Sequence, residues 1–280
     1  MAKQLGQIHT VNFDVTGIAS DDTTYLLDTA GELCGQLNHM VRMGNYFKVV
    51  GIDMTVSDND GDAIGGGSVT GELRYYAPTR GRCEAFKSAF AAVRNGAKIQ
   101  GLRLTDNENY DFRCPLKNTS LYSAPYGDLA TKATINGTDE LVLSNTDLAS
   151  GVFDIYNSNI EPSQGGVTPT FSQGFGVPGT GVGTDFVLDA EALYDPAMKN
   201  IASTQMESIP FQLSYDPQGD GAAFSMQWRP DPALYLAVLT GQFELYIDEQ
   251  DRDNGVAALR ISVAIHISGW KSIMGNPDRS

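Results

Sequence analysis

Leu259-Arg260-Ile261-Ser262-Val263-Ala264-Ile265-His266-Ile267 carries an aliphatic side chain at every second position. Because successive side chains of a strand point to opposite faces of a sheet, this alternation predicts a strand with one face in the hydrophobic core. The stretch just before it repeats the pattern through Phe243, Leu245 and Ile247. His266 falls on the opposite, polar face. The C-terminal part of the chain is therefore expected to be β-sheet.

The same period of two recurs earlier in the chain. Residues 8–17, 47–56 and 68–77 each alternate between polar and apolar side chains, with a change of phase at Gly51 in the second stretch. Each stretch predicts a strand with one packed face. Further strands are predicted at residues 99–104, 110–115, 185–188, 209–215 and 223–228.

One segment has a helical period instead. Between Arg82 and Asn95 the apolar side chains recur every three or four residues, which is typical of a helix with one buried face. Thr79 is a candidate N-cap, and Gly96 is a candidate helix end. We therefore predict a helix over residues 82–95.

The two halves of the chain share an order of elements. A predicted strand runs into Tyr76-Ala77-Pro78 in the first half and into Trp228-Arg229-Pro230 in the second. A helix is predicted after each, the second beginning at Asp231-Pro232 and ending at Gly241, because Asp caps helices and Pro is accepted at their first position. This repeat predicts an all-β fold of two consecutive eight-stranded antiparallel jelly rolls with one short helix in each. The predicted domains are residues 1–135 and residues 136–280, with a Gly/Pro-rich loop near 157–183.

The charge of the chain is unevenly distributed. The formal net charge is −15, which opposes direct binding of nucleic acid through phosphate contacts. Residues 74–103 nevertheless contain seven basic residues and a single acidic one, Glu84. A basic helix face on an acidic body suits contacts between identical subunits or with anionic lipid, and scattered internal salt bridges are the alternative. The candidate interface or membrane-facing residues are Arg80, Arg82, Lys87, Arg94 and Lys98.

No motif in the sequence carries a complete reactive site. The glycine-rich stretch at residues 174–179 matches a dinucleotide-binding pattern, but Pro178 opposes the helix that such a site needs. The acidic turn with Asp58, Asp60 and Asp62 fails the register of a calcium loop. The longest apolar run, residues 233–239, is too short to cross a bilayer. We expect neither a catalytic residue nor a cofactor nor a resident metal, and the protein is predicted not to be an enzyme.

The run Tyr75-Tyr76-Ala77-Pro78-Thr79-Arg80-Gly81-Arg82-Cys83, the helix after it and Tyr110-Asp111-Phe112-Arg113 resemble the major capsid proteins of tailless, lipid-containing bacteriophages, in particular the finnlakevirus-like single-stranded-DNA phages. The resemblance covers about residues 74–116. It implies a virion capsid protein that is assembled in the host cytoplasm as homotrimeric, pseudo-hexagonal capsomers of an icosahedral shell over an internal membrane. The partners that it implies are neighbouring capsomers and minor capsid, penton or spike proteins. It supplies no catalytic residue.

Two other classes of function stay open at this point. A carbohydrate-binding or adhesive β-sandwich, such as a spike or a lectin, would use the acidic loops for calcium and Tyr122, Tyr126 or Trp228 to stack on sugar. A hydrolase on a β-scaffold is the third hypothesis, although no acid, base and nucleophile are tied together by their spacing.

Overall fold

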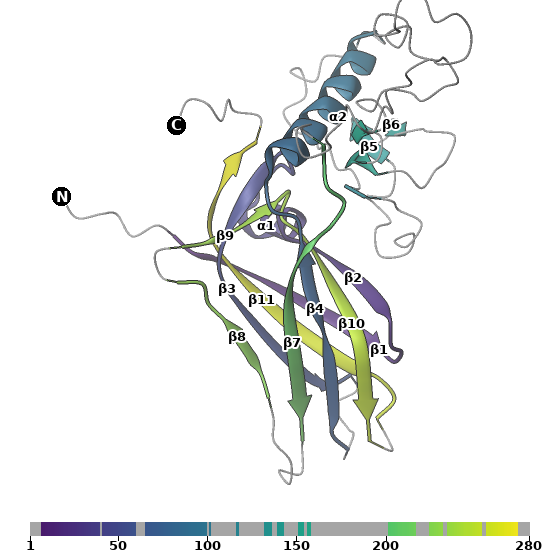
Figure 1. The fold of residues 1–280 in the computed structure, drawn as a ribbon, viewed down its shortest axis with the longest axis vertical. Coiled ribbons are helices and arrows are strands. Elements are labelled where there is room, and N and C mark those ends of the chain that lie inside the picture. The colour runs from purple at the N-terminus through teal and green to yellow at the C-terminus, as the bar shows by residue number, and fades with distance from the viewer. Residues whose placement is uncertain are drawn as a thin grey trace, which may run out of the picture.

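In the computed structural model, two antiparallel sheets pack face to face, and two helices lie near one end of the sandwich (Figure 1). The residues that the structure describes are 7–39, 41–59, 65–99, 101, 116–117, 132–135, 139–142, 151–153, 156–157, 201–216, 224–231, 234–253 and 256–273.

Two sheets contain nearly all the described strands. The first has the order β1 (His9–Ile18), β11 (Leu259–Ser272), β3 (Asn45–Asp58) and β8 (Met226–Trp228), and β9 (Leu236–Leu239) also pairs with β3. The second has the order β2 (Thr23–Asp28), β10 (Gln242–Arg252), β4 (Gly67–Tyr75) and β7 (Glu207–Tyr215). A separate hairpin is formed by β5 (Lys132–Ile135) and β6 (Asp139–Val142), and the helices are α1 (Thr29–Leu37) and α2 (Arg80–Ile99).

The pairing of these strands has the order of one jelly roll. Strand β1 pairs with β11, β2 with β10, β3 with β8 and β4 with β7, all antiparallel. The first strand thus pairs with the last, and the following pairs are nested inward until β4 pairs with β7. This is the pattern of a long hairpin rolled into a sandwich. The all-β prediction is confirmed, with two antiparallel sheets that share one core.

The described strands do not divide at residue 135 as the tandem of jelly rolls requires. In both sheets, strands from residues 1–135 are hydrogen-bonded to strands from residues 136–280, for example β1 to β11 and β4 to β7. The alternation of side chains in a strand shows which face is buried but not which strand is its neighbour. Similar orders of strands in the two halves therefore suggested two sandwiches, whereas the described halves complete one.

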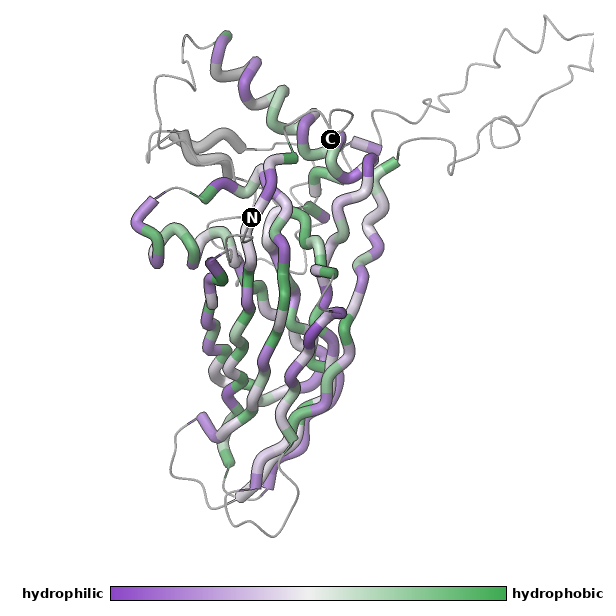
Figure 2. Tube along the Cα trace, turned by 90° about the vertical axis from the view of Figure 1, so that its left-hand side faces the viewer, coloured by the Kyte–Doolittle hydropathy of each residue, from purple (hydrophilic) through white to green (hydrophobic). Residues whose placement is uncertain are grey.

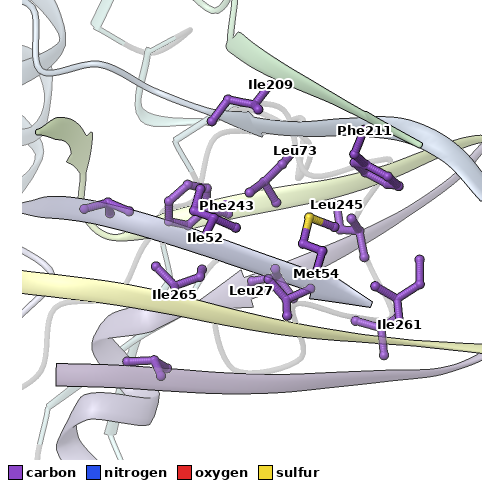
Figure 3. Packing of buried hydrophobic residues seen from close by; sticks show 14 of the residues in the cluster. Leu27, Ile52, Met54, Leu73, Ile209, Phe211, Phe243, Leu245, Ile261 and Ile265 are labelled. Atoms are coloured by element: carbon purple, nitrogen blue, oxygen red, sulfur yellow. The ribbon is translucent and has the colours of Figure 1, made fainter. Parts of the chain in front are cut away.

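The core confirms the faces that the alternation predicted. All five alternate aliphatic residues of β11, from Leu259 to Ile267, are buried, as are Phe243, Leu245 and Ile247 of β10. Labelled side chains from both sheets point toward one another (Figure 3), and hydrophobic and hydrophilic residues alternate along the strands (Figure 2). The phase change in β3 is also confirmed, since the register with β11 shifts beside Gly51.

The first predicted helix is confirmed and is longer than expected. Helix α2 begins at Arg80, where the backbone nitrogen of Arg82 donates to Thr79 Oγ1 at 3.4 Å. It continues past Gly96 to Ile99, so Gly96 does not end it and the strand predicted from residue 99 is wrong at that residue. A single glycine weakens a helix but does not stop it. Gly101 lies in a turn, so the strand predicted at 99–104 is not present there either. The strands predicted at 110–115 and 185–188, residues 100 and 102–104, and almost all of the 157–183 loop lie outside the described residues.

The second predicted helix is wrong. Residues 236–239 form β9, which pairs with Tyr46–Val49 of β3. Thr240 and Gly241 then make a tight turn with φ of 61° and 73°. The apolar run before the turn satisfies its backbone by joining a sheet edge, which outweighs the local Asp-Pro signal for a helix.

Besides β9, four elements were not predicted from the sequence, namely β2, α1, β5 and β6. Helix α1 is capped by Asp28, whose Oδ1 accepts from the nitrogen of Gly31 at 3.2 Å, and it ends at Asn38 in the left-handed region with φ of 49°. Leu33 anchors it to the sandwich core. The capping aspartate was a usable signal for this helix.

Candidate functional site

Among the described residues, helix α2 packs on the end of the sandwich through its first half. Ala85 and Phe86 are buried in a second apolar cluster with Tyr76, Phe153 and Leu239. The rings of Tyr76 and Phe153 meet edge to face with 5.1 Å between centroids. Beyond Phe90, every α2 residue whose exposure is described lies open to solvent. The second half of the helix therefore projects from the sandwich (Figure 1).

The start of α2 is fixed by the buried side chain of Arg82, which is 3 % exposed. Its Nη1 donates to Glu207 Oε1 at 2.8 Å and to the carbonyl oxygen of Ala77 at 3.0 Å. Its Nε donates to the carbonyl of Ser203 at 3.0 Å, and its Nη2 donates to the carbonyl of Gln205. The guanidinium thus joins the beginning of α2 to the beginning of β7.

Arg82 is consequently not part of an exposed basic face, contrary to its selection from the sequence. The helical period contained the necessary signal, because Arg82, Phe86 and Ala89 stand at positions i, i+4 and i+7 and share one face. A charged residue on the apolar face of a helix can be buried with that face when hydrogen bonds satisfy its charged group. The hydrogen-bond acceptors of Arg82 are one carboxylate and three carbonyls.

The four remaining candidates form a basic stripe on the other side of α2, namely Arg80, Lys87, Arg94 and Lys98. With a turn of about 100° per residue, all four lie within a narrow sector of the helix surface opposite Arg82. Arg94 and Lys98 are exposed, and Lys87 is half-buried. Arg80 Nε donates to Glu84 Oε1 at 3.1 Å. Together with the pairs Arg74–Glu72 and Arg82–Glu207, the internal salt bridges that the sequence left open are therefore present at three of the basic residues of the segment 74–103. The structure therefore groups four of the five predicted residues on one surface.

The opposite end of the sandwich is acidic. Six exposed carboxylates, from the turn after β1 and from β10 and its end, form a cluster that we call the acidic end: Asp21, Asp22, Asp248, Glu249, Asp251 and Asp253. Strand β10 runs away from α2 toward the far end of the molecule (Figure 1). Among the side chains that the structure describes, the basic stripe and the acidic end therefore lie at opposite ends of the protein.

Several of these carboxylates are fixed by hydrogen bonds. The backbone nitrogen of Gln250 donates to Asp21 Oδ1 at 2.9 Å. The backbone nitrogen of Gly66 donates to Asp253 Oδ2 at 2.7 Å. The Tyr246 hydroxyl donates to Asp22 Oδ1 at 2.6 Å, and this bond raises the pKa of Tyr246. The turns at this end are therefore ordered by their own acidic side chains. Asp60 and Asp62 of the neighbouring loop lie outside the described residues.

A chain of polar contacts crosses the outer face of the first sheet. Asp53 of β3 accepts from Arg229 Nη2 at 2.9 Å and lies 2.8 Å from His266 Nε2 of β11. His266 Nδ1 is 3.0 Å from Thr10 Oγ1 of β1. The hydrogen bond from Arg229 is the main cause that lowers the pKa of Asp53. These contacts tie four neighbouring segments together, and they confirm that His266 stands on the polar face of its strand.

The remaining histidines, aromatic residues and cysteines that the sequence offered as candidates pack against neighbouring side chains where they are described. His9 and His39 both lie near Trp270, with ring centroids 5.9 and 6.4 Å from it. Trp228 packs against the sandwich core, while Tyr122 and Tyr126 lie outside the described residues. Cys34 and Cys83 are free thiols, and burial raises the pKa of Cys83. Within the described part of the chain, His, Cys, Asp and Glu side chains form no group able to hold a metal.

Comparison with protein-family models, with curated proteins and with solved structures finds no match to this chain. Among the described residues, neither α1 nor α2 has the length and hydrophobicity that a bilayer-spanning helix requires.

Proposed function

We propose that the protein is a structural capsid protein. In this proposal it self-assembles as trimeric capsomers into an icosahedral virion shell, over an internal membrane. The observation that carries the proposal is the jelly-roll order of the two sheets, in which four antiparallel pairs are nested from β1–β11 to β4–β7. Viral capsid domains, lectin domains and cupins share this architecture, so the choice among them depends on the surfaces.

The interior of the sandwich supports assembly rather than enclosure of a small ligand. Buried apolar side chains from both sheets fill the space between them, among them Ile52, Leu73, Phe243 and Ile265 (Figure 3). Protein interiors of this kind are close-packed. The features that distinguish this chain therefore lie on its outside, at the basic stripe of α2 and at the acidic end.

Shell building suits such a body because it needs stiff subunits with self-complementary surfaces. Long strands such as β3 and β11, each of 14 residues, give the subunit a rigid wall. Many contacts that are individually weak add up through symmetry when identical subunits close a ring. The proposal uses one jelly roll for each subunit, because the described strands of both halves are already combined in a single sandwich.

The proposal is tested on the full chain after expression and purification. Light scattering coupled to size exclusion is expected to give a particle of three times 30.1 kDa, and negative-stain images are expected to show capsomers or closed shells. A protein that stays monomeric at every concentration would overturn the proposal. Retention on a glycan array together with calcium-dependent thermal stabilisation would favour the lectin or spike class instead.

A further inference from the structure

The basic stripe of α2 and the acidic end stand far apart on one molecule, so they cannot neutralise each other within it. Figure 1 shows α2 beyond one end of the sandwich, while β10 runs to the other end. Arg94 and Lys98 of the stripe are exposed, as are Asp248, Glu249 and Asp251 of the acidic end. The two surfaces have opposite charge and are both accessible.

We propose that the basic stripe of α2 docks on the acidic end of a second copy of this chain. The inference rests on the proposed function and deepens it by naming the two surfaces that meet. The contact is heterologous, because each copy offers a different surface to each of its two neighbours. Repetition of such a contact closes a ring when it rotates each copy by a whole fraction of a full turn without a shift along the axis, and otherwise builds a filament. In this proposal the capsomer is such a closed ring.

The overall charge of the chain makes this orientation the favoured one. Two copies that each carry a net charge of −15 repel when acidic surfaces face each other. Contact through the stripe replaces this repulsion with attraction, because Arg94 and Lys98 then face carboxylates. Complementary charges mainly select orientation and speed association, so the stripe determines which surfaces meet.

Both ends also present an apolar side chain that a contact can bury. Ile99, the last residue of α2, is 87 % exposed, and Phe224 is 56 % exposed. Phe224 belongs to the acidic end of the sandwich, since its backbone pairs with Ser214. The hydroxyl of the next residue, Tyr215, has a pKa raised by burial and by the charges of Asp58 and Asp253. Apolar burial adds to charge complementarity at the same two places.

A second copy fits these observations better than an anionic lipid surface. A lipid surface would use the stripe alone and would leave the exposed acidic end and Phe224 without a role. A second copy uses the features of both ends. Changing the acidic end is expected to weaken binding to a second copy but not binding to a lipid surface. This difference is the basis of the test.

The experiment reverses each charge separately and then both together. Arg94→Glu with Lys98→Glu reverses the stripe, and Glu249→Lys with Asp251→Lys reverses the acidic end. These four side chains are exposed, so circular dichroism is expected to stay unchanged. Either pair alone is expected to weaken self-association at least tenfold in sedimentation equilibrium. The four changes combined in one chain restore opposite charges at the two surfaces, and association is expected to recover to within about threefold of the unchanged protein.

The matched control is Lys48→Glu with Lys271→Glu, which changes the net charge by the same amount as the stripe variant at other sites. It is expected to change association less than threefold. Failure of the combined variant to recover, or equal weakening by the control, would overturn the docking proposal while capsomers of the unchanged chain still support the capsid function. Flotation with phosphatidylserine-containing vesicles is the second measurement. Vesicle binding that requires the stripe, with self-association unaffected by either pair, would overturn the proposal in favour of lipid. A monomeric unchanged chain would overturn the capsid function itself.

Discussion

Arg82 Nη1 lies 2.8 Å from Glu207 Oε1, and this ion pair joins the first turn of α2 to the first residue of β7. Glu207 Oε2 also accepts from the backbone nitrogen of Ala77 at 2.9 Å. The ion pair therefore connects two segments that are far apart in the chain. It holds the start of α2 and the start of β7 against the same side of the sandwich. The projecting part of α2, with its basic stripe, is oriented by this contact.

Removal of Arg82 is expected to destabilise the protein strongly. Arg82→Ala removes the guanidinium donors from the carbonyls of Ser203 and Gln205 and from Glu207 Oε1, at a cost of about 2–4 kcal/mol in free energy of unfolding. Arg80→Ala is the matched control, because the Arg80–Glu84 pair is exposed and contributes less than about 1 kcal/mol. Urea denaturation measures both. Equal effects of the two changes would contradict a special role for Arg82.

Acid is expected to weaken the outer face of the first sheet through Asp53. The hydrogen bond from Arg229, with a smaller one from His266, lowers the pKa of Asp53 from its ordinary value of 3.8. A carboxylate with a lowered pKa stabilises the fold above the unfolded-state value, and this contribution is lost as the pH falls through the lower folded-state value. Thermal unfolding is compared for the unchanged protein and for Asp53→Asn.

The difference in melting temperature between these two proteins is expected to be constant above about pH 5 and to shrink below pH 3.8. Glu249→Gln, an exposed change on the other sheet, provides the comparison. A difference that persisted unchanged to pH 2 would show that Asp53 contributes through its shape and not through its charge.

The faces of the strands could be read from the sequence, but their partners could not. The alternation in residues 259–267 correctly predicted five buried side chains. The phase change in β3 was visible because Gly51 and Ile52, two neighbouring residues, both belong to the buried set. Pairing depends on contacts between residues far apart in the chain, such as Val11 with Ile265. Local periodicity carries no information about such contacts. One sandwich and two sandwiches therefore gave the same local signals.

The candidate site shows the same division. The stripe of Arg80, Lys87, Arg94 and Lys98 follows from helical spacing alone. Helical spacing also places Arg82 on the apolar face of α2, but its partner Glu207 belongs to a strand distant in sequence, so the ion pair itself could not be predicted. The acidic end could not be assembled from the sequence, because only the fold brings Asp21 beside β10, where it accepts from the backbone nitrogen of Gln250.

The shared sandwich predicts one cooperative unfolding transition for both halves of the chain. Leu27, from the first half, and Ile265, from the second, are 2 % and 0 % exposed in one core. Leu27→Ala and Ile265→Ala are each expected to lower the free energy of unfolding by about 2–5 kcal/mol. Both are expected to shift the same calorimetric peak. Two peaks that respond separately to the two changes would indicate two independent domains.

The turn between β9 and β10 is expected to tolerate only glycine at residue 241. Gly241 has φ of 73°, and a Cβ there would lie 2.8 Å from the ring of Phe47. Gly241→Ala therefore combines a left-handed backbone with a clash in the core, and about 3 kcal/mol of stability is expected to be lost. Gly17 has nearly the same φ, 74°, but has no atom within 4 Å of the added Cβ, so Gly17→Ala is expected to cost about 1 kcal/mol. Chemical denaturation of the two variants separates backbone strain from the clash, and equal losses would show that Phe47 moves aside without cost.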